Sequence, residues 1–382
     1  MAVWPDTAVK LSADQVLAWR MRRQWLDPLG TSDAVATVER LCGVQAQVAS
    51  AAALAVATRQ RNPKADEVSQ ALADRTIIKT WAMRGTLHLM PAAEAAAYLS
   101  LVAAARTWEK GSWQRAFVTT DQLDAITGAV REVLQGRVLT REQLVTEVLD
   151  RSGDAALAAH LRSGWSTVLK PLAWQGYLCQ GPAEGNRVTF TSPETWFPDW
   201  TGLPAPEDAA AVAIPAYLGA HGPATTRAFD AWLTRGASKK GALRGWFADL
   251  AGDRADGLVT VDVDGRSSYA RAADVDDIAS TAPSTVVRLL PGFDQYVLGP
   301  GTNDTTIIAA NRRAKISKAA GWISPVVVAG GRVAGTWEVA DNAVAVVLFS
   351  PAGPVTATAI ESEVDRLGRF LGTELSLSIS TG

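Results

Sequence analysis

Apolar residues recur at helical spacing through the middle of the chain, and two short strand-like segments follow them. The T-x-x-Q pattern at 140–143 is a capping box and predicts the start of a helix. A second helical stretch is predicted between Gly153 and Gly176, and residues 177–192 predict a strand, a glycine-rich turn and a strand. Helix, turn, helix and hairpin in this order are typical of a winged helix, a variant of the helix-turn-helix.

The same order of elements appears in two further places. Downstream, three helical stretches between 210 and 250 precede two strands joined by a turn at 264–265. Upstream, helical patterns precede the apolar hairpin 76–90, whose turn is predicted near 84–85, although this copy fits the pattern more loosely. The chain therefore contains three candidate winged-helix units.

The C-terminal part of the chain differs, because strand patterns dominate it. Strands are predicted within 285–290, 324–339 and 343–350, and a helix over 361–372 closes the chain. We therefore predict an α+β fold with three tandem winged-helix units, a C-terminal β-rich segment and a closing helix, divided at 1–118, 119–200, 201–282 and 283–382.

Gln45 and Gln47 stand out because they are spaced i, i+2 between two alanine-rich helical stretches. Gly43 just before them predicts the end of the first helix. Side chains alternate along an extended backbone, so this spacing would point both amides into one space. An amide offers acceptors and donors but does not titrate, so the pair can hold a water or a polar ligand. The alternative is that both side chains satisfy nearby backbone groups.

The composition narrows the class of protein and of site. The 382 residues are 48% hydrophobic and 20% charged, as is ordinary for a soluble globular protein. Two cysteines, Cys42 and Cys179, and three histidines make a disulfide framework or a metal centre improbable, and we expect no cofactor. No apolar run is long enough to span a membrane, and the first residues lack the apolar region of a signal peptide, so we expect a cytoplasmic protein. We also expect a monomer.

The positive charges are concentrated although the net charge is −2. Between Asp304 and Glu338 the chain carries five basic residues and no acidic one, which suits a surface that contacts phosphates. A second basic cluster lies at 20–23. Ordinary solvated surface is the alternative for both. The candidate DNA contacts are Arg84, His88, Arg312, Arg313, Lys315 and Lys318.

Five motifs occur in a fixed order along nearly the whole chain, namely LCGVQAQ, TWAMRGTLHLMP, HGPAT, LLPGFDQYVLG and SPVVVAGGRVAGTWE. In this combination the chain resembles the AlkZ-type winged-helix DNA glycosylases, which are YcaQ-related bacterial enzymes that act on azinomycin-type interstrand crosslinks and bulky N7-alkylguanines. The resemblance implies that Gln45 and Gln47 are the catalytic pair. The YcaQ branch has Asp at the second of these positions, and this chain departs from it. The chain also has GPGTNDTT where the family leads us to expect an aromatic residue and an arginine.

The chemistry of such lesions is compatible with a catalytic pair that lacks an acid. An N7-alkylated purine already carries positive charge, so it can leave without a general acid. What remains is an oxocarbenium-like sugar and a water to capture it. Two amide oxygens could orient that water and stabilise the developing cation. The resemblance therefore implies a monofunctional DNA glycosylase that acts on double-stranded DNA with alkylated purines or crosslinks, and that is associated with the nucleoid.

Two other classes of protein remain open from the sequence. A winged-helix transcription regulator would also carry tandem wings and basic patches, and a small-molecule binding protein could use the glutamines as ligands. Asp294 is the one carboxylate that suggests a catalytic base, although a structural acceptor for backbone N–H groups is the preferred role. Trp81, Trp165 and Trp337 are expected in the core rather than as stacking platforms for bases.

Overall fold

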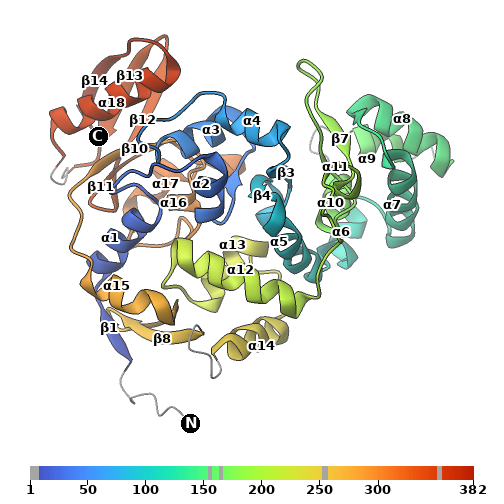
Figure 1. The fold of residues 1–382 in the computed structure, drawn as a ribbon, viewed down its shortest axis with the longest axis horizontal. Helices are drawn as coiled ribbons and strands as arrows, with labels where there is room; N and C mark the ends of the chain where they lie inside the picture. Colours follow the sequence, from blue (N-terminus) through green and yellow to red (C-terminus); the bar gives the residue numbers. More distant parts are fainter. Residues whose placement is uncertain (1–7, 154–156, 163–166, 252–256, 351–354) are drawn as a thin grey trace. The chain divides into compact units, whose positions relative to one another are not determined.

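A computed structural model describes residues 8–153, 157–162, 167–251, 257–350 and 355–382. The chain forms two compact units. The first consists of Met1–Ser69, Ile214–Trp232 and Phe247–Gly382, and the second of Gln70–Ala213 and Leu233–Trp246. Figure 1 traces the chain from blue to red through its elements. No helix in the described ranges is both long and apolar enough to cross a membrane.

The first unit mixes helices with two sheets. Its elements are β1 (Val9–Leu11), α1 (Ala13–Arg23), α2 (Ala34–Arg40), β2 (Val44–Gln45), α3 (Ala49–Ala57), β8 (Leu258–Val263), β9 (Arg266–Arg271), α15 (Val275–Ser280), β10 (Val287–Leu290), α16 (Gln295–Leu298), α17 (Arg313–Ile316), β11 (Val326–Ala329), β12 (Arg332–Ala340), β13 (Ala343–Leu348), α18 (Ala357–Leu371) and β14 (Ser376–Thr381). Four helices cross the boundary between the units, namely α4 (Glu67–Ala73), α12 (Pro206–His221), α13 (Thr226–Thr234) and α14 (Lys240–Ala251).

The second unit contains a hairpin, several helices and a small sheet. Its elements are β3 (Ile77–Trp81), β4 (Leu87–Pro91), α5 (Ala92–Ala104), α6 (Gly111–Ala116), α7 (Thr120–Leu134), β5 (Leu139–Thr140), α8 (Arg141–Ser152), α9 (Ala158–Arg162), α10 (Lys170–Trp174), β6 (Cys179–Gln180), β7 (Thr189–Thr191) and α11 (Pro193–Trp196). Short 3₁₀ turns of both units are η1 (Met83–Gly85), η2 (Thr107–Glu109), η4 (Thr167–Leu169), η5 (Ala272–Asp274), η6 (Ala310–Arg312) and η7 (Ala319–Gly321).

The helices and wings predicted for the middle of the chain are present. Thr140 caps α8, and its hydroxyl and the side chain of Gln143 close the predicted capping box. Antiparallel pairing joins β7 to β6 and to β5, which gives a three-stranded sheet. The second predicted helical stretch is broken into α9, η4 and α10, and Trp165 lies outside the described residues. The mixed α+β class is confirmed, with small sheets as winged-helix units require.

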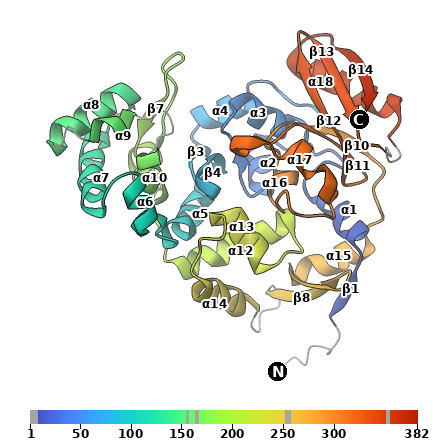
Figure 2. The same cartoon turned by 180° about the vertical axis from the view of Figure 1, so that it is seen from behind.

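The downstream wing, β8–β9, gains a strand that the sequence pattern did not predict. β8 and β9 pair antiparallel around a turn in which Asp264 has φ 47° and Gly265 has φ 81°. β1 from the start of the chain adds to β8 in parallel. Leu11 and Trp19 are buried with Val261 in the core beneath this sheet, beside α1 and α15, which lie next to each other in Figures 1 and 2.

The C-terminal sheet has the order β10-β11-β12-β13-β14. α18 packs on it through Ile360, Val364 and Leu367. Figure 2 shows this helix lying against the sheet. The helix does not close the chain, contrary to the prediction, because β14 follows it and pairs in parallel with β13. Ser376–Thr381 alternates Leu377 and Ile379 with serines, a strand pattern that the prediction did not use. The segment is a mostly exposed edge strand, with Leu377 packed against the core of the sheet. The division of the chain into four segments stays a prediction.

Candidate functional site

The turn before Gln45 is a Schellman motif at the end of α2. The N–H of Gly43 donates to the carbonyl of Val38 at 3.0 Å, and the N–H of Cys42 donates to that of Glu39 at 2.9 Å. Cys42 and Gly43 have φ of 57° and 88°, in the left-handed region. The predicted helix end at Gly43 is thus confirmed, and these hydrogen bonds fix the direction in which the chain enters β2.

The two glutamines differ in exposure. Gln45 ends β2 and its side chain is 6% exposed, Ala46 is 1% exposed, and Gln47 is exposed in the bend that leads into α3. Neither glutamine lacks an interaction partner. The extended backbone expected at Gln45 is present. That both amides point into one space stays a prediction.

The predicted hairpin with Arg84 and His88 is formed by β3 and β4. Arg84 has φ 57° at the turn and is half-buried. His88 is fully buried, and its Nδ1 lies 3.0 Å from the carbonyl oxygen of Thr86. Burial, with a smaller effect of the Arg84 charge, lowers the pKa of His88 to about 3, so the imidazole is neutral. The structure thus favours the alternative role for His88, a polar residue that ties the hairpin together, over a phosphate contact.

The basic segment after Asp304 is only partly free for DNA. The guanidinium of Arg312 donates to the carbonyl of Ser350 and lies 5.1 Å from the centre of the Phe349 ring, and the Lys315 ammonium lies 5.3 Å from the same ring. Arg313 and Lys318 are exposed. Arg332 is paired with Asp14 at 2.6 Å, an acidic partner that is remote in sequence.

The second basic cluster, on α1, is largely structural. Arg20 is 4% exposed and donates to the carbonyls of Gly222 and Pro223, and Arg23 donates to the carbonyl of Gly219 at 2.9 Å. These carbonyls belong to the end of α12 and the residues just after it, where helical carbonyls lack intrahelical partners. Only Arg22 of this cluster is exposed, so the cluster is not a phosphate-contacting face.

Asp294 is a buried structural acceptor. Its carboxylate accepts two hydrogen bonds from Arg59, at 2.7 and 2.8 Å, and one from the N–H of Tyr296 at 2.8 Å. The side chains of Arg59 and Asp294 have no exposed surface. The preferred role for Asp294 is therefore confirmed, and a carboxylate held in this way is not available as a base.

The tryptophans divide into core and surface. Trp81 and Trp337 are 6% and 5% exposed, as expected for core residues. Trp322 is 50% exposed and packs edge-on against Phe293, with ring centres 5.0 Å apart. Trp322 lies four residues after Lys318 and two after Ala320, which has φ 56°. This aromatic residue was not among the predicted site residues, although its position beside the basic segment is a signal for it in the sequence.

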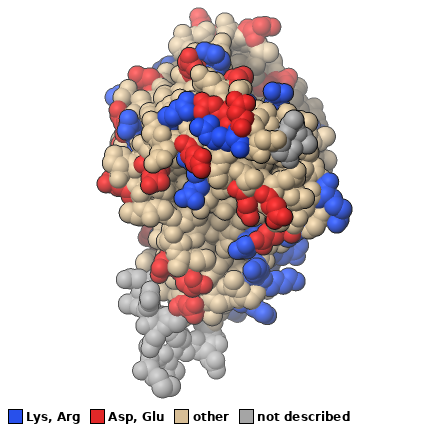
Figure 3. Space-filling view, turned by 90° about the vertical axis from the view of Figure 1, so that its right-hand side faces the viewer, with Lys and Arg blue, Asp and Glu red and all other residues tan. Residues whose placement is uncertain are grey.

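Surface charge in the second unit is balanced rather than one-sided. Arg137 and Arg151 both pair with Glu147, and Arg187 pairs with Glu184. In the space-filling view of Figure 3, basic and acidic side chains lie next to one another. Within the described ranges, no group of three or more His, Cys, Asp or Glu side chains is placed to hold a metal ion.

Comparisons with known proteins place this chain in a family. The model of the family "DNA glycosylase AlkZ-like" matches residues 38–370. The chain belongs to this family. It is 48% identical over 366 residues to an interstrand DNA cross-link repair glycosylase of Streptomyces sahachiroi, with 95% of the chain and 98% of the relative covered. It also matches the structure of the DNA glycosylase AlkZ from that organism with a TM-score of 0.93 and 47% identity, covering 97% and 100% of the two chains.

Several motifs of this AlkZ-like glycosylase serve the fold. A Cβ on Gly299 would lie 2.2 Å from the ring of His221, so only glycine fits beside this histidine. The hydroxyl of Tyr296 donates to the carbonyl of Gly331 at 2.7 Å. The HGPAT, LLPGFDQYVLG and SPVVVAGGRVAGTWE motifs therefore meet in one buried region of the first unit, whereas the Gln45–Gln47 turn retains an exposed polar side chain.

Proposed function

We propose that this AlkZ-like glycosylase hydrolyses the N-glycosidic bond of cationic N7-alkylated purines in double-stranded DNA, with Gln45 and Gln47 acting at the reacting sugar, and that it opens interstrand crosslinks. The observation that carries the proposal is the Schellman turn that delivers the two amides to the start of α3. The name of the Streptomyces sahachiroi relative, a cross-link repair glycosylase, supports the choice of substrate.

The different exposure of the glutamines suggests a division of roles. Gln47 is exposed and therefore accessible to DNA. Gln45 is almost fully buried, so its amide has few alternative orientations and can hold a water in a fixed position. The amide oxygens then present the negative ends of their dipoles to the sugar as positive charge develops there. Because an amide does not titrate, the pair provides orientation and electrostatic stabilisation rather than proton transfer.

The proposed substrate follows from what this pair cannot do. A neutral purine needs protonation before it leaves, and an amide pair cannot supply the proton. A purine alkylated at N7 is already cationic. The proposal therefore predicts selectivity for lesions with a positively charged leaving base. An enzyme with such substrates would be found with the nucleoid in the cytoplasm.

The test uses the whole chain and two duplexes, one containing N7-methylguanine and one a nitrogen-mustard crosslink. Released base and abasic sites are measured for the first, and strand separation on a denaturing gel for the second. We expect base release and abasic sites, and single strands from the crosslinked duplex. If no cationic lesion is excised and the chain binds one duplex sequence selectively, it is a winged-helix regulator instead.

A further inference from the structure

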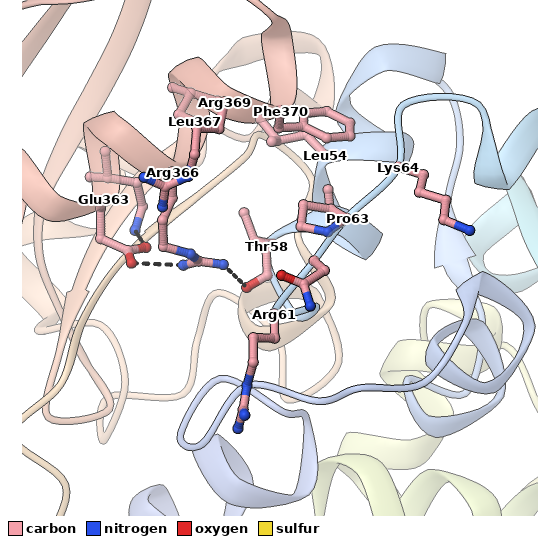
Figure 4. Close-up of a pocket in the computed structure, with 13 residues that line it drawn as sticks. Leu54, Thr58, Arg61, Pro63, Lys64, Glu363, Arg366, Leu367, Arg369 and Phe370 are labelled. Atoms are coloured by element: carbon pink, nitrogen blue, oxygen red, sulfur yellow. Dashed lines mark hydrogen bonds and ion pairs between the residues drawn. The ribbon is translucent and has the colours of Figure 1, made fainter.

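A cavity of about 360 Å³ lies in the first unit between the end of α3, the loop after it and α18. Figure 4 shows the residues that line it. Its apolar side is formed by Leu54 on α3, Leu367 and Phe370 on α18, and Leu289 on β10. Its polar side is rich in basic residues, which are Arg61, Lys64, Arg366 and Arg369.

Among the described residues a single carboxylate, that of Glu363, lines the cavity, and its charge is already neutralised. Glu363 accepts hydrogen bonds from Arg288 at 3.2 Å, from Arg366 at 2.7 Å and from the backbone N–H of Leu289 at 3.3 Å. Arg366 also donates to the carbonyl of Thr58 at the end of α3, as the dashed lines in Figure 4 show. Glu363, Arg288 and Arg366 therefore form a structural group that joins α18 to α3 and leaves no net negative charge at the cavity.

Three further cations at the cavity have no such partner. The side chains of Arg61, Lys64 and Arg369 are exposed, and none of them makes an ion pair within the described ranges. Asp66 lies two residues after Lys64, and Asp365 lies one helical turn before Arg369, so each offsets part of the charge of its neighbour. Arg369 is in the last turn of α18, where a cation also stabilises the helix dipole. Arg61 has neither of these local explanations. Together the three form a positively charged rim.

We propose that this rim, Arg61, Lys64 and Arg369, binds backbone phosphates of the substrate DNA on one side of the lesion. The inference rests on the proposed function, because it concerns the same substrate. α3 connects the glutamine pair to the rim. Gln47 lies two positions before the first residue of this helix, and Arg61 lies four positions after its last residue. The nine residues of this helix alone span about 14 Å, which equals about four phosphate spacings along one DNA strand at 3.4 Å each. The rim would therefore lie several nucleotides from the target base.

The charge of the rim favours DNA phosphates over a small anion. Guanidinium and ammonium groups at the mouth of the cavity are exposed and reach outward, as Lys64 does in Figure 4. The interior wall is apolar on one side only, where Leu54, Leu367 and Phe370 lie. A small anion bound inside would face Leu54 and Phe370 on one side. A phosphate of a long strand needs only the rim, and its binding releases counterions from the DNA.

The experiment compares the whole chain with a variant carrying Arg61→Ala, Lys64→Ala and Arg369→Ala. Binding is measured at several salt concentrations on two N7-methylguanine duplexes, one with arms of ten base pairs on each side and one trimmed to two base pairs on each side, whose ends are closed by uncharged ethylene-glycol loops that keep it double-stranded. Each lost phosphate contact should lower the slope of log affinity against log salt by about 0.9. We expect the slope to fall by about 2 to 3 on the long duplex, with a tenfold or greater loss of affinity near physiological salt, and no change on the trimmed one.

Two controls keep this result interpretable. Asn62→Ala alters the same loop without removing charge and should leave the salt slope as in the wild type. The double variant Arg61→Lys with Arg369→Lys keeps all three positive charges of the rim, so its slope should also be that of the wild type. Equal slopes for the wild type and the triple variant on the long duplex, while the wild type still excises the base, would overturn the rim and leave the proposed function standing. An equal fall of the slope on both duplexes would overturn the placement of the rim on phosphates that flank the lesion. Absence of excision by the wild type would instead overturn the proposed function.

Discussion

Two polar clusters of the first unit differ in their partners and in their exposure. Around Arg59, its guanidinium and the carboxylate of Asp294 are fully buried and hydrogen-bond to each other and to nearby backbone groups. At the end of α2, a Schellman turn presents one buried amide, Gln45, and one exposed amide, Gln47. The first cluster determines where segments that are remote in sequence meet, and the second leaves a polar group accessible to a ligand. A polar motif points to chemistry only once its partners and its exposure are known.

The largest effect that this comparison predicts concerns the buried ion pair. Asp294→Asn keeps the shape of the side chain but leaves the Arg59 charge buried without compensation. Breaking a buried pair in this way typically costs about 3–5 kcal/mol in the free energy of unfolding. The measurement is chemical denaturation of the wild type and the variant. The double variant with Arg59→Met should be less destabilised than the sum of the two single variants.

The same variant separates structure from catalysis. Below its unfolding transition, folded Asp294→Asn should excise N7-methylguanine at a rate close to that of the wild type, because its carboxylate is engaged by Arg59 and Tyr296. A variant with wild-type stability and strongly reduced excision would make Asp294 a catalytic group and remove the contrast between the two clusters.

The next largest effect concerns the glutamines. Gln45→Ala or Gln47→Ala should lower the single-turnover rate of excision and leave DNA affinity nearly unchanged. Removing one hydrogen-bonding group at a transition state typically costs 10²–10³ in rate, and we expect about 10²-fold or less here because the cationic base leaves readily. The double variant should lose less than the product of the single losses if both residues hold one water. The rate should show no steep dependence between about pH 5.5 and 8.

The outcome for the glutamines can also go against the proposal. Full activity of the double variant would place catalysis elsewhere in the chain. A fall in the free energy of unfolding without a change in the rate of the folded protein would assign the pair to the structural role that the sequence left open, and it would make both clusters alike.

A titratable group in the second unit extends the comparison to pH. The pKa of His88 is about 3 in the folded protein, lowered mainly by burial, against 6.5 as its ordinary value. Below about pH 6.5 the unfolded chain therefore binds a proton at His88 that the folded chain does not. The free energy of unfolding falls as the pH decreases from about 6.5 to about 3, and below pH 3 His88 causes no further loss. At pH 5 this amounts to about 2 kcal/mol relative to pH 7. The free energy of unfolding is measured with urea at pH 7, 6 and 5 for the wild type and for His88→Asn. Its fall between pH 7 and pH 5 should be smaller in the variant by this amount. An equal pH dependence in both proteins would mean that His88 is accessible to protons when folded.

The sequence predicts local elements better than it predicts partners. Capping patterns and turns depend on neighbouring residues, and for this reason the start of α8 and the helix end at Gly43 are as predicted. The partners of Arg20 and Arg332 lie hundreds of positions away, so a basic cluster in the sequence gave no indication of the carbonyls and the carboxylate that engage them. β14 is a different case, because the alternation of Leu377 and Ile379 with serines is a local strand signal, but it spans only six mostly exposed residues after a helix that was expected to be the last element.

The smallest effects are expected in the basic segment, where neighbouring cations differ in their partners. Arg313 and Lys318 are exposed, whereas Arg332 is paired with Asp14 at 2.6 Å. If the segment contacts DNA, Arg313→Ala with Lys318→Ala should lower the slope of log affinity against log salt by up to about 1.8, equally for unrelated sequences. Arg332→Ala is the matched control and should change the slope little, because Asp14 already neutralises its charge.

Trp322 tests the same surface independently of charge, because it is exposed four residues after Lys318. Stacking of a tryptophan on a base is worth about 1–3 kcal/mol and does not depend on counterion release. Trp322→Ala should therefore weaken DNA binding without altering the slope, and Trp322→Phe should restore part of the affinity. The measurement is fluorescence anisotropy of a labelled duplex over a series of salt concentrations. Wild-type affinity in Trp322→Ala, together with unchanged slopes in the Arg313 and Lys318 variants, would make this segment ordinary solvated surface and direct the search for DNA contacts to the rim beside α3.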